Sequence, residues 1–304
     1  MFKNIDYKND IVIPAWEVIK NDFKVKRFYF FPGLLSIISL TTILLYQSIY
    51  TYIVIFHKKE KALELILQFF HSDYFIEFVV GVALFLIIYI FIIPIFEGGL
   101  IKYLDEKKNG VQMNSLDAVG FGLSRFLPMF EYSNVFSEFK YISILNSYLF
   151  LIRFIGIEYI KYINYLIIFI LMISTFINIL FAYAKYEIVL KNKGVFESIA
   201  ISTQISILNL KNTLKLYILM FIINIRVLFN FLIFLFFPIL LVISVSYFTT
   251  KIFLAFAIIM ILIMFIFFVL LIGYVTAVLE VFKVAVWYFA YVNGRERIEK
   301  ENKD

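Results

Sequence analysis

The sequence predicts an all-α integral membrane protein with about six transmembrane helices in three hairpins, flanked by cytoplasmic amphipathic helices. Hydrophobic residues make up 63% of the 304 residues and charged residues only 16%, whereas soluble domains contain about 45–50% and about 25%. The apolar residues form long uncharged runs of the length that crosses a bilayer. Lysine and arginine gather in the segments that join alternate runs, as expected for cytoplasmic loops.

Residues 1–27 are polar and charged, and we expect them to contain a cytoplasmic helix rather than a signal peptide. Ala15, Ile19 and Phe23 recur at helical spacing, with Trp16 beside them. One interpretation is a helix that lies in the membrane interface, with the tryptophan at headgroup level. The other is a soluble cap packed on the spans.

The first two spans are predicted at residues 28–56 and 74–96. The first of them contains no charged residue, and it is longer than the ~20 residues that cross the hydrocarbon core, so the helix would be tilted. Residues 57–73, between these spans, are amphipathic and would lie on the far side of the membrane.

The remaining spans are predicted at residues 141–160, 162–184, 216–247 and 252–279, followed by a cytoplasmic tail at 283–304. The link between the third and fourth spans is short, which predicts a tight outer hairpin.

Two polar intervals share one plan, and we call residues 100–127 the first elbow and residues 183–216 the second elbow. Each gathers lysines, turns at a Gly-Val pair and continues into an amphipathic helix. In the first elbow, Asn114 can cap this helix and Pro128 should end it. Its apolar stripe consists of Leu116, Val119, Leu123 and Phe126.

The helix of the second elbow carries Ser198, Ser202 and Ser206 along one face. Three hydroxyl groups at this spacing could contact a headgroup phosphate. A face that packs on another helix, or that faces water, is the simpler interpretation.

The distribution of positive charge predicts the orientation. The predicted cytoplasmic segments contain 21 lysine and arginine residues, and the predicted outer links contain five. The positive-inside rule therefore places both termini in the cytoplasm, in a multi-pass protein of the cell membrane.

A threefold internal repeat is also predicted. The segments Lys107–Val111 and Lys191–Val195 match at a spacing of 84 residues, and each precedes an amphipathic helix and a pair of spans. With the N-terminal segment, the three units would place helices near Ala15, Ala118 and Ala200. All three units would have the same orientation.

The exit sequences FEGGLIKYLDEKKNGV and FAYAKYEIVLKNKGVFESIAIS, with the C-terminal AVWYFAYVNG, resemble a broad family of six-span membrane proteins. They are similar to the membrane domain found beside glycerophosphodiester phosphodiesterases. In that family the hydrolytic residues lie in a separate soluble barrel, so the resemblance implies no catalytic residue in this chain.

The sequence contains none of the common catalytic signatures HExxH, GxSxG or the phosphate-binding P-loop. Gly120 and Gly122 fall within a helix pattern and not in a dinucleotide fingerprint. His57 and His71 have carboxylates nearby but are interpreted as interfacial side chains. We therefore expect no enzyme, no cofactor and no bound metal. The net charge of +6 is spread over loops, which does not indicate a nucleic-acid partner.

The candidate site is a set of polar residues within or at the edge of predicted spans: Arg153, Glu77, Arg226, Asn224 and Asn230. A charge at the centre of a membrane helix costs roughly 2.5–3.5 kcal/mol and therefore suggests a function. Arg153 could pair with Glu77, which enters from the same outer face, whereas Glu158 is five residues along and faces away. Arg226 would lie either at the midplane or at the inner interface.

These observations favour a non-enzymatic membrane protein, a scaffold or partner subunit that contacts the lipid bilayer and a membrane or cytoplasmic protein. The alternative is a transporter or permease subunit for a small solute or lipid, with Arg226, Asn224 and Asn230 along its path. A lipid-handling enzyme is disfavoured because no nucleophile, base and metal ligands cluster in the sequence.

Overall fold

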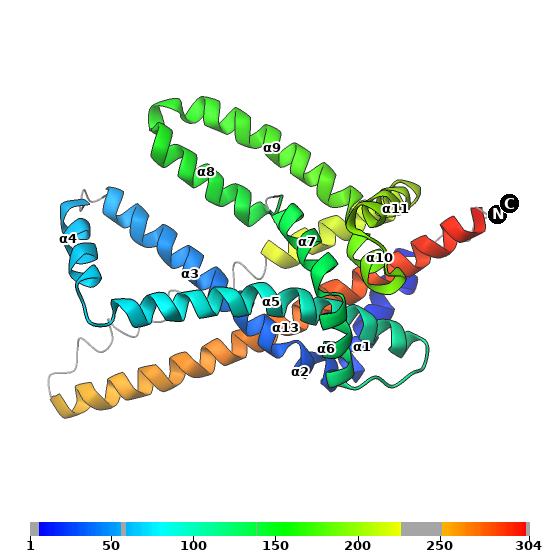
Figure 1. Ribbon diagram of the computed structural model, residues 1–304, viewed down its shortest axis with the longest axis horizontal. Coiled ribbons are helices and arrows are strands. Elements are labelled where there is room, and N and C mark those ends of the chain that lie inside the picture. Colours follow the sequence, from blue (N-terminus) through cyan, green and yellow to red (C-terminus); the bar gives the residue numbers. More distant parts are fainter. Residues whose placement is uncertain (1–5, 56–58, 138, 226–250, 302–304) are drawn as a thin grey trace. The chain divides into compact units, whose positions relative to one another are not determined.

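The computed structural model of the chain describes residues 6–55, 59–137, 139–225 and 251–301 (Figure 1). Every regular element in these ranges is a helix and none is a strand, which confirms the all-α prediction for this part of the chain. The chain forms two compact units. Unit 1 takes the described parts of Met1–Val25, Pro94–Ile225 and Val281–Asp304, and unit 2 those of Lys26–Ile93 and Arg226–Glu280.

Unit 2 is built from few elements, which are α3 (Phe30–Ile55), α4 (Lys59–Phe70) and the N-terminal parts of α5 (Phe75–Lys108) and α13 (Lys251–Glu301). Ile37 of α3 packs against Phe268 and Ile272 of α13. A Cβ atom at Gly33 would lie 2.8 Å from the Cβ of Ala277. Small residues therefore allow α3 and α13 to approach closely, as is common between membrane helices.

Unit 1 contains the remaining elements, which are η1 (Tyr7–Val12), α1 (Ile13–Asn21), α6 (Ser115–Ser124), α7 (Phe126–Ser137), α8 (Tyr141–Ile155), η2 (Ile157–Tyr159), α9 (Ile160–Leu180), α10 (Ala184–Lys191), α11 (Val195–Leu208), a helix at Leu210–Ile225, and the C-terminal parts of α5 and α13. The short helix α2 (Phe23–Phe28) contains the boundary between the units.

The structure supports a membrane protein with three to five candidate spans among its described residues. Three helices are long and apolar enough to cross a membrane, namely Phe75–Lys108, Ile157–Lys191 and Ile266–Lys300. Two bent pairs could each form one more, namely Phe126–Phe136 with Tyr141–Ile155 at 41° and Val195–Leu208 with Leu210–Ile225 at 101°. The count of six spans stays a prediction.

The predicted third span, at 141–160, is shorter than expected. Its helix α8 has 15 residues, below the ~20 that a straight crossing requires. It ends at Gly156, whose positive φ of 104° a side chain would disfavour. The helices α8 and α9 then lie side by side as a hairpin, joined through Ile144, Ile163 and Ile167 (Figure 1).

The structure describes the fifth predicted span only in part and the sixth over its whole length. The helix Leu210–Ile225 covers the start of the span predicted at 216–247, and residues 226–250 lie outside the described ranges. Helix α13 covers the span predicted at 252–279 and continues without interruption to Glu301. Residues 283–301 of the segment predicted as a tail therefore form the end of a 51-residue helix.

The first elbow folds partly as predicted. Asn114 caps α6, because its side-chain oxygen accepts a hydrogen bond from the N–H of Ser115. The prediction that Pro128 ends this helix is wrong, since α6 already ends at Ser124. Pro128 instead lies in the first turn of α7, where a missing N–H breaks no helical hydrogen bond.

The two elbows also turn differently, although their sequences match. In the first, Gly110 has a positive φ of 77°. In the second, Asn192 takes the left-handed conformation with φ 56°, and Gly194 is extended and precedes α11. Asparagine tolerates this conformation better than most residues. The helices predicted near Ala15, Ala118 and Ala200 are α1, α6 and α11, while their threefold relation stays a prediction.

The N-terminal helix α1 buries Ala15 and Ile19 within unit 1. The side chain of Trp16 is half exposed and meets the ring of Phe282 edge-on. Phe23, which was predicted on the same face, is 64% exposed because α1 ends at Asn21 and the chain is extended at Asp22.

Helix α6 packs through its small residues and not through its apolar stripe. Leu116 is 77% exposed, whereas Ala118 and Gly122 are buried. A Cβ atom at Gly122 would overlap with the carbonyl oxygen of Ile95 in α5 and would lie 2.9 Å from the amide nitrogen of Gly99. This contact requires glycine on steric grounds.

Substituting Gly122 with alanine is expected to destabilise unit 1 by about 1–3 kcal/mol, because the added methyl group forces α6 away from the α5 backbone. Gly120 is the matched control, since a Cβ atom there meets nothing within 4 Å. Gly120→Ala should leave stability unchanged or raise it by up to ~1 kcal/mol through helix propensity. Thermal melting of the two purified variants in detergent checks this, and equal melting temperatures would contradict the close packing.

Candidate functional site

The described part of the chain does not test whether the residues proposed from the sequence come together. Arg226 and Asn230 lie outside it. The exposed Asn224 accepts a hydrogen bond of 2.9 Å from the Lys283 ammonium group. This asparagine therefore interacts with a lysine of α13.

Arg153 and Glu77 belong to different units, so their contact stays a prediction. Arg153 lies in the last turn of α8 and is partly exposed, and Glu77 lies in the first turn of α5 and is exposed. His71 is exposed and its Nδ1 lies 2.7 Å from the carbonyl oxygen of Leu67. Among the described residues, no three histidine, aspartate or glutamate side chains form a group that could hold a metal ion.

The structure instead brings together polar side chains from the ends of the apolar runs, all within unit 1. The first such contact joins Glu97 of α5 to Lys185 of α10, with 2.5 Å between the carboxylate oxygen and the ammonium nitrogen. Both side chains are about one-fifth exposed. Each residue directly follows a predicted span, so the ion pair ties two helix ends to each other.

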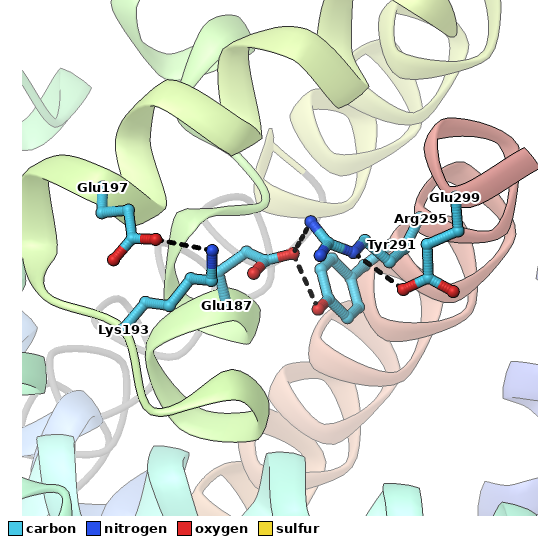
Figure 2. Close-up of polar contacts among 6 residues, drawn as sticks. All are labelled: Glu187, Lys193, Glu197, Tyr291, Arg295 and Glu299. Atoms are coloured by element: carbon cyan, nitrogen blue, oxygen red, sulfur yellow. Dashed lines mark hydrogen bonds and ion pairs between the residues drawn. The ribbon is translucent and has the colours of Figure 1, made fainter. Parts of the chain in front are cut away.

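Glu187 is the centre of a second contact, which Figure 2 shows. Its side chain is 0% exposed. One carboxylate oxygen accepts a hydrogen bond of 3.0 Å from the Tyr291 hydroxyl group. The same oxygen forms an ion pair with the Arg295 guanidinium group, also at 3.0 Å. The other oxygen, Oε2, has no hydrogen-bond donor among the described residues.

Local sequence explains why α13 can satisfy this carboxylate. Tyr291 and Arg295 are four residues apart, so they lie on the same helix face. Arg295 also pairs with Glu299, one turn further along, at 3.2 Å (Figure 2). The buried carboxylate thus joins α10 to the C-terminal end of α13.

Asp22 forms the third contact and ties the N-terminal segment to α5. Its carboxylate accepts hydrogen bonds from the Tyr103 hydroxyl group at 2.9 Å and from the Lys107 ammonium group at 2.5 Å. Burial alone would raise the pKa of Asp22, but these hydrogen bonds and the lysine charge outweigh burial and hold the pKa below its usual value.

Two more contacts connect α13 to its neighbours in unit 1. The Tyr288 hydroxyl group donates to the Asp105 carboxylate at 2.9 Å. The Arg297 guanidinium group donates to the side-chain oxygen of Asn209 at 2.6 Å. Helix α13 is therefore held by α5, by α10 and by the junction that follows α11.

The serine face of α11 packs on the end of α9, which confirms the packing interpretation. The last carbonyl groups of a helix lack intrahelical donors. Ser202 donates to the carbonyl oxygen of Leu180 at 2.8 Å, and Ser206 donates to that of Ile179 at 2.9 Å. Ser198 is also buried, and its hydroxyl group has no partner among the described residues.

A cavity of about 260 Å³ lies beside the Glu97–Lys185 pair. Polar and apolar side chains both contribute to its wall, which comprises Glu97, Tyr132, Ser133, Phe136, Lys140, Asn178, Ala182, Lys185, Tyr217, Met220 and Trp287. All of these residues belong to unit 1. Glu97 is the one carboxylate among the described residues of this wall, and it also experiences the positive charges of Lys140 and Lys283.

No protein-family model, no curated protein and no solved structure matches the chain. The resemblance to the membrane domain beside glycerophosphodiester phosphodiesterases therefore remains an expectation.

Sequence reasoning missed Glu97, Lys185 and Glu187 as interacting residues, although all three lie in the exit sequences that suggested the resemblance. A usable signal was present, since each of these charges stands within a few residues of the end of an apolar run. The spacing of four residues between Tyr291 and Arg295 was a second signal, because it places a donor and a cation on the same helix face.

Arg295→Leu is expected to destabilise unit 1 by about 3–5 kcal/mol, because it leaves the buried Glu187 carboxylate without its cation. Glu187→Leu combined with Arg295→Leu should recover part of this loss. Lys193→Gln is the matched control, since Lys193 pairs at 2.6 Å with a Glu197 side chain that is 60% exposed, and such pairs contribute about 0–1 kcal/mol. Unfolding free energies measured in detergent should show the largest loss for Arg295→Leu, a smaller loss for the double variant and the smallest for Lys193→Gln. A different order would contradict a structural role for Glu187.

Proposed function

We propose that the chain is a non-enzymatic multi-pass membrane protein in which unit 1 is a rigid platform for a membrane or cytoplasmic protein partner. The observation that carries this proposal is that three carboxylates of unit 1 form ion pairs between different elements. Glu97, Asp22 and Glu187 each contact a cation from another element. Such contacts fix helices relative to one another, which is what a scaffold requires.

Helix α6 offers a surface for the partner. Leu116, Leu123 and Leu127, on α6 and at the start of α7, are 77%, 60% and 62% exposed. Exposed apolar side chains that are grouped on one surface often mark a protein or membrane contact. The charge asymmetry supports a cytoplasmic position for this elbow and for both termini of a six-span chain.

The resemblance to the membrane domain beside glycerophosphodiester phosphodiesterases agrees with this role. In that family, the membrane domain accompanies a soluble catalytic domain. A partner that docks on the first elbow would bring a soluble protein to the membrane in a comparable way.

A transporter or permease subunit is the second candidate, and the charged cavity is the observation that favours it. Opposite charges at the ends of membrane helices could bind a small solute on its path. Uptake of solute by the purified protein in vesicles would decide for this candidate and against the platform.

A single introduced thiol can test both the orientation and the partner, because the chain has no cysteine. Leu116→Cys should react with a membrane-impermeant maleimide only after the cells are opened. A thiol-linked photo-crosslinker at this position should join the chain to one discrete protein. Phe169→Cys, on an exposed position of the apolar helix α9, is the control and should give no such adduct.

Labelling of the thiol at position 116 from outside intact cells would contradict the orientation. The same crosslinking pattern at positions 116 and 169 would contradict the platform.

A further inference from the structure

We infer that the cavity of unit 1 binds a phosphate group, supplied by the headgroup of an anionic phospholipid. This site goes beyond the platform role, since the cavity and the exposed surface of α6 have no residue in common. Its failure would therefore leave the proposed partner contact untouched.

The balance of charge around the cavity favours an anion. Among the described residues, the wall contains two lysines and one carboxylate. Lys185 pairs with that carboxylate, Glu97, whereas Lys140 is exposed and forms no ion pair with any described residue. Lys283 adds a further positive charge that acts on Glu97. Among the described wall residues, one carboxylate thus stands against two lysines, and the excess is positive.

The hydrogen-bonding groups of the wall show where a phosphate would bind. The Tyr132 hydroxyl group already donates to the carbonyl oxygen of Phe181, and the Asn178 amide nitrogen donates to that of Phe139. The Ser133 hydroxyl group has no hydrogen-bond partner among the described residues. Ser133, Lys140 and the indole N–H of Trp287 are therefore donors that remain for a ligand, and a phosphate accepts from all three kinds of group.

The position of the cavity along the helices indicates a lipid. Glu97 follows the apolar run of α5, Lys185 follows that of α9, and Lys140 directly precedes α8. All three therefore lie where apolar sequence ends, which is the level of the phospholipid headgroups. Trp287, also in the wall, is a residue type that is enriched at this level.

The size of the cavity agrees with a headgroup rather than a whole lipid. Pockets for drug-sized ligands have volumes of roughly 300–1,000 Å³, and this cavity of about 260 Å³ is smaller. Phe136 and Met220 in the wall are apolar and could contact the glycerol end of the lipid. The acyl chains would remain in the bilayer.

Trp287 provides the readout for a test, because the chain contains only two tryptophans. In a Trp16→Phe background, Trp287 becomes the sole tryptophan, and its fluorescence can be excited selectively over that of the tyrosines. The purified protein would be titrated with short-chain phosphatidylglycerol, with short-chain diacylglycerol, which lacks the phosphate, and with glycerol 3-phosphate. A saturable change of fluorescence is expected with phosphatidylglycerol and none with diacylglycerol.

The titration with glycerol 3-phosphate shows whether the phosphate comes from a lipid headgroup or from a soluble ester. Weak or no binding of glycerol 3-phosphate supports a lipid headgroup, whereas equal binding shows that a soluble phosphate ester is the ligand and overturns the lipid assignment.

Lys140→Gln should weaken phosphatidylglycerol binding about tenfold, the effect of losing one charge-assisted hydrogen bond. Lys161→Gln is the control, because Lys161 is also an exposed lysine, at the start of α9 and outside the cavity. An equal effect of the two substitutions, a saturable response to diacylglycerol, or no saturable response to phosphatidylglycerol would overturn the inference.

Discussion

The structure of unit 1 depends on the need of polar groups at the ends of apolar helices to find partners within the protein. A buried carboxylate without a cation costs several kcal/mol, because its lost hydration is not replaced. Glu187 meets this requirement through Arg295 and Tyr291, and Glu97 meets it through Lys185. The same requirement applies to backbone carbonyl groups, which Ser202 and Ser206 satisfy at the end of α9. Each of these contacts joins two elements, so satisfying the helix ends also fixes the arrangement of unit 1.

This arrangement has two consequences for function. Charges that are paired across helices hold the elements of unit 1 together, and this is the observation on which the proposed platform rests. The pairing is also unequal, because Lys140 lines the cavity without an ion pair to any described residue while Lys185 has Glu97. This excess of positive charge among the described wall residues is the basis on which we propose the phosphate site.

The sequence predicted those features that depend on neighbouring residues. Apolar runs predicted the helices, and the Asn114 cap followed from local chemistry. Contacts between distant segments could not be predicted, because hydrophobic periodicity does not specify which of several lysines meets Glu97. The end of α6 was mispredicted at Pro128 since proline is accepted both after a helix and in the first turn of the next one. The candidate residues were chosen for their depth in predicted spans, whereas Glu97, Lys185 and Glu187 lie just beyond the ends of the spans, where a charge is not unusual from the sequence alone.

A double-mutant cycle on Glu97 and Lys185 tests most directly whether the contacts between helix ends hold unit 1 together. The unfolding free energy of the protein in detergent would be measured for Glu97→Gln, for Lys185→Gln and for the double variant. The structure predicts a coupling energy of about 1–3 kcal/mol between the two positions, since each single substitution leaves a partly buried charge unpaired. Additive effects, with a coupling energy near zero, would contradict this account of unit 1.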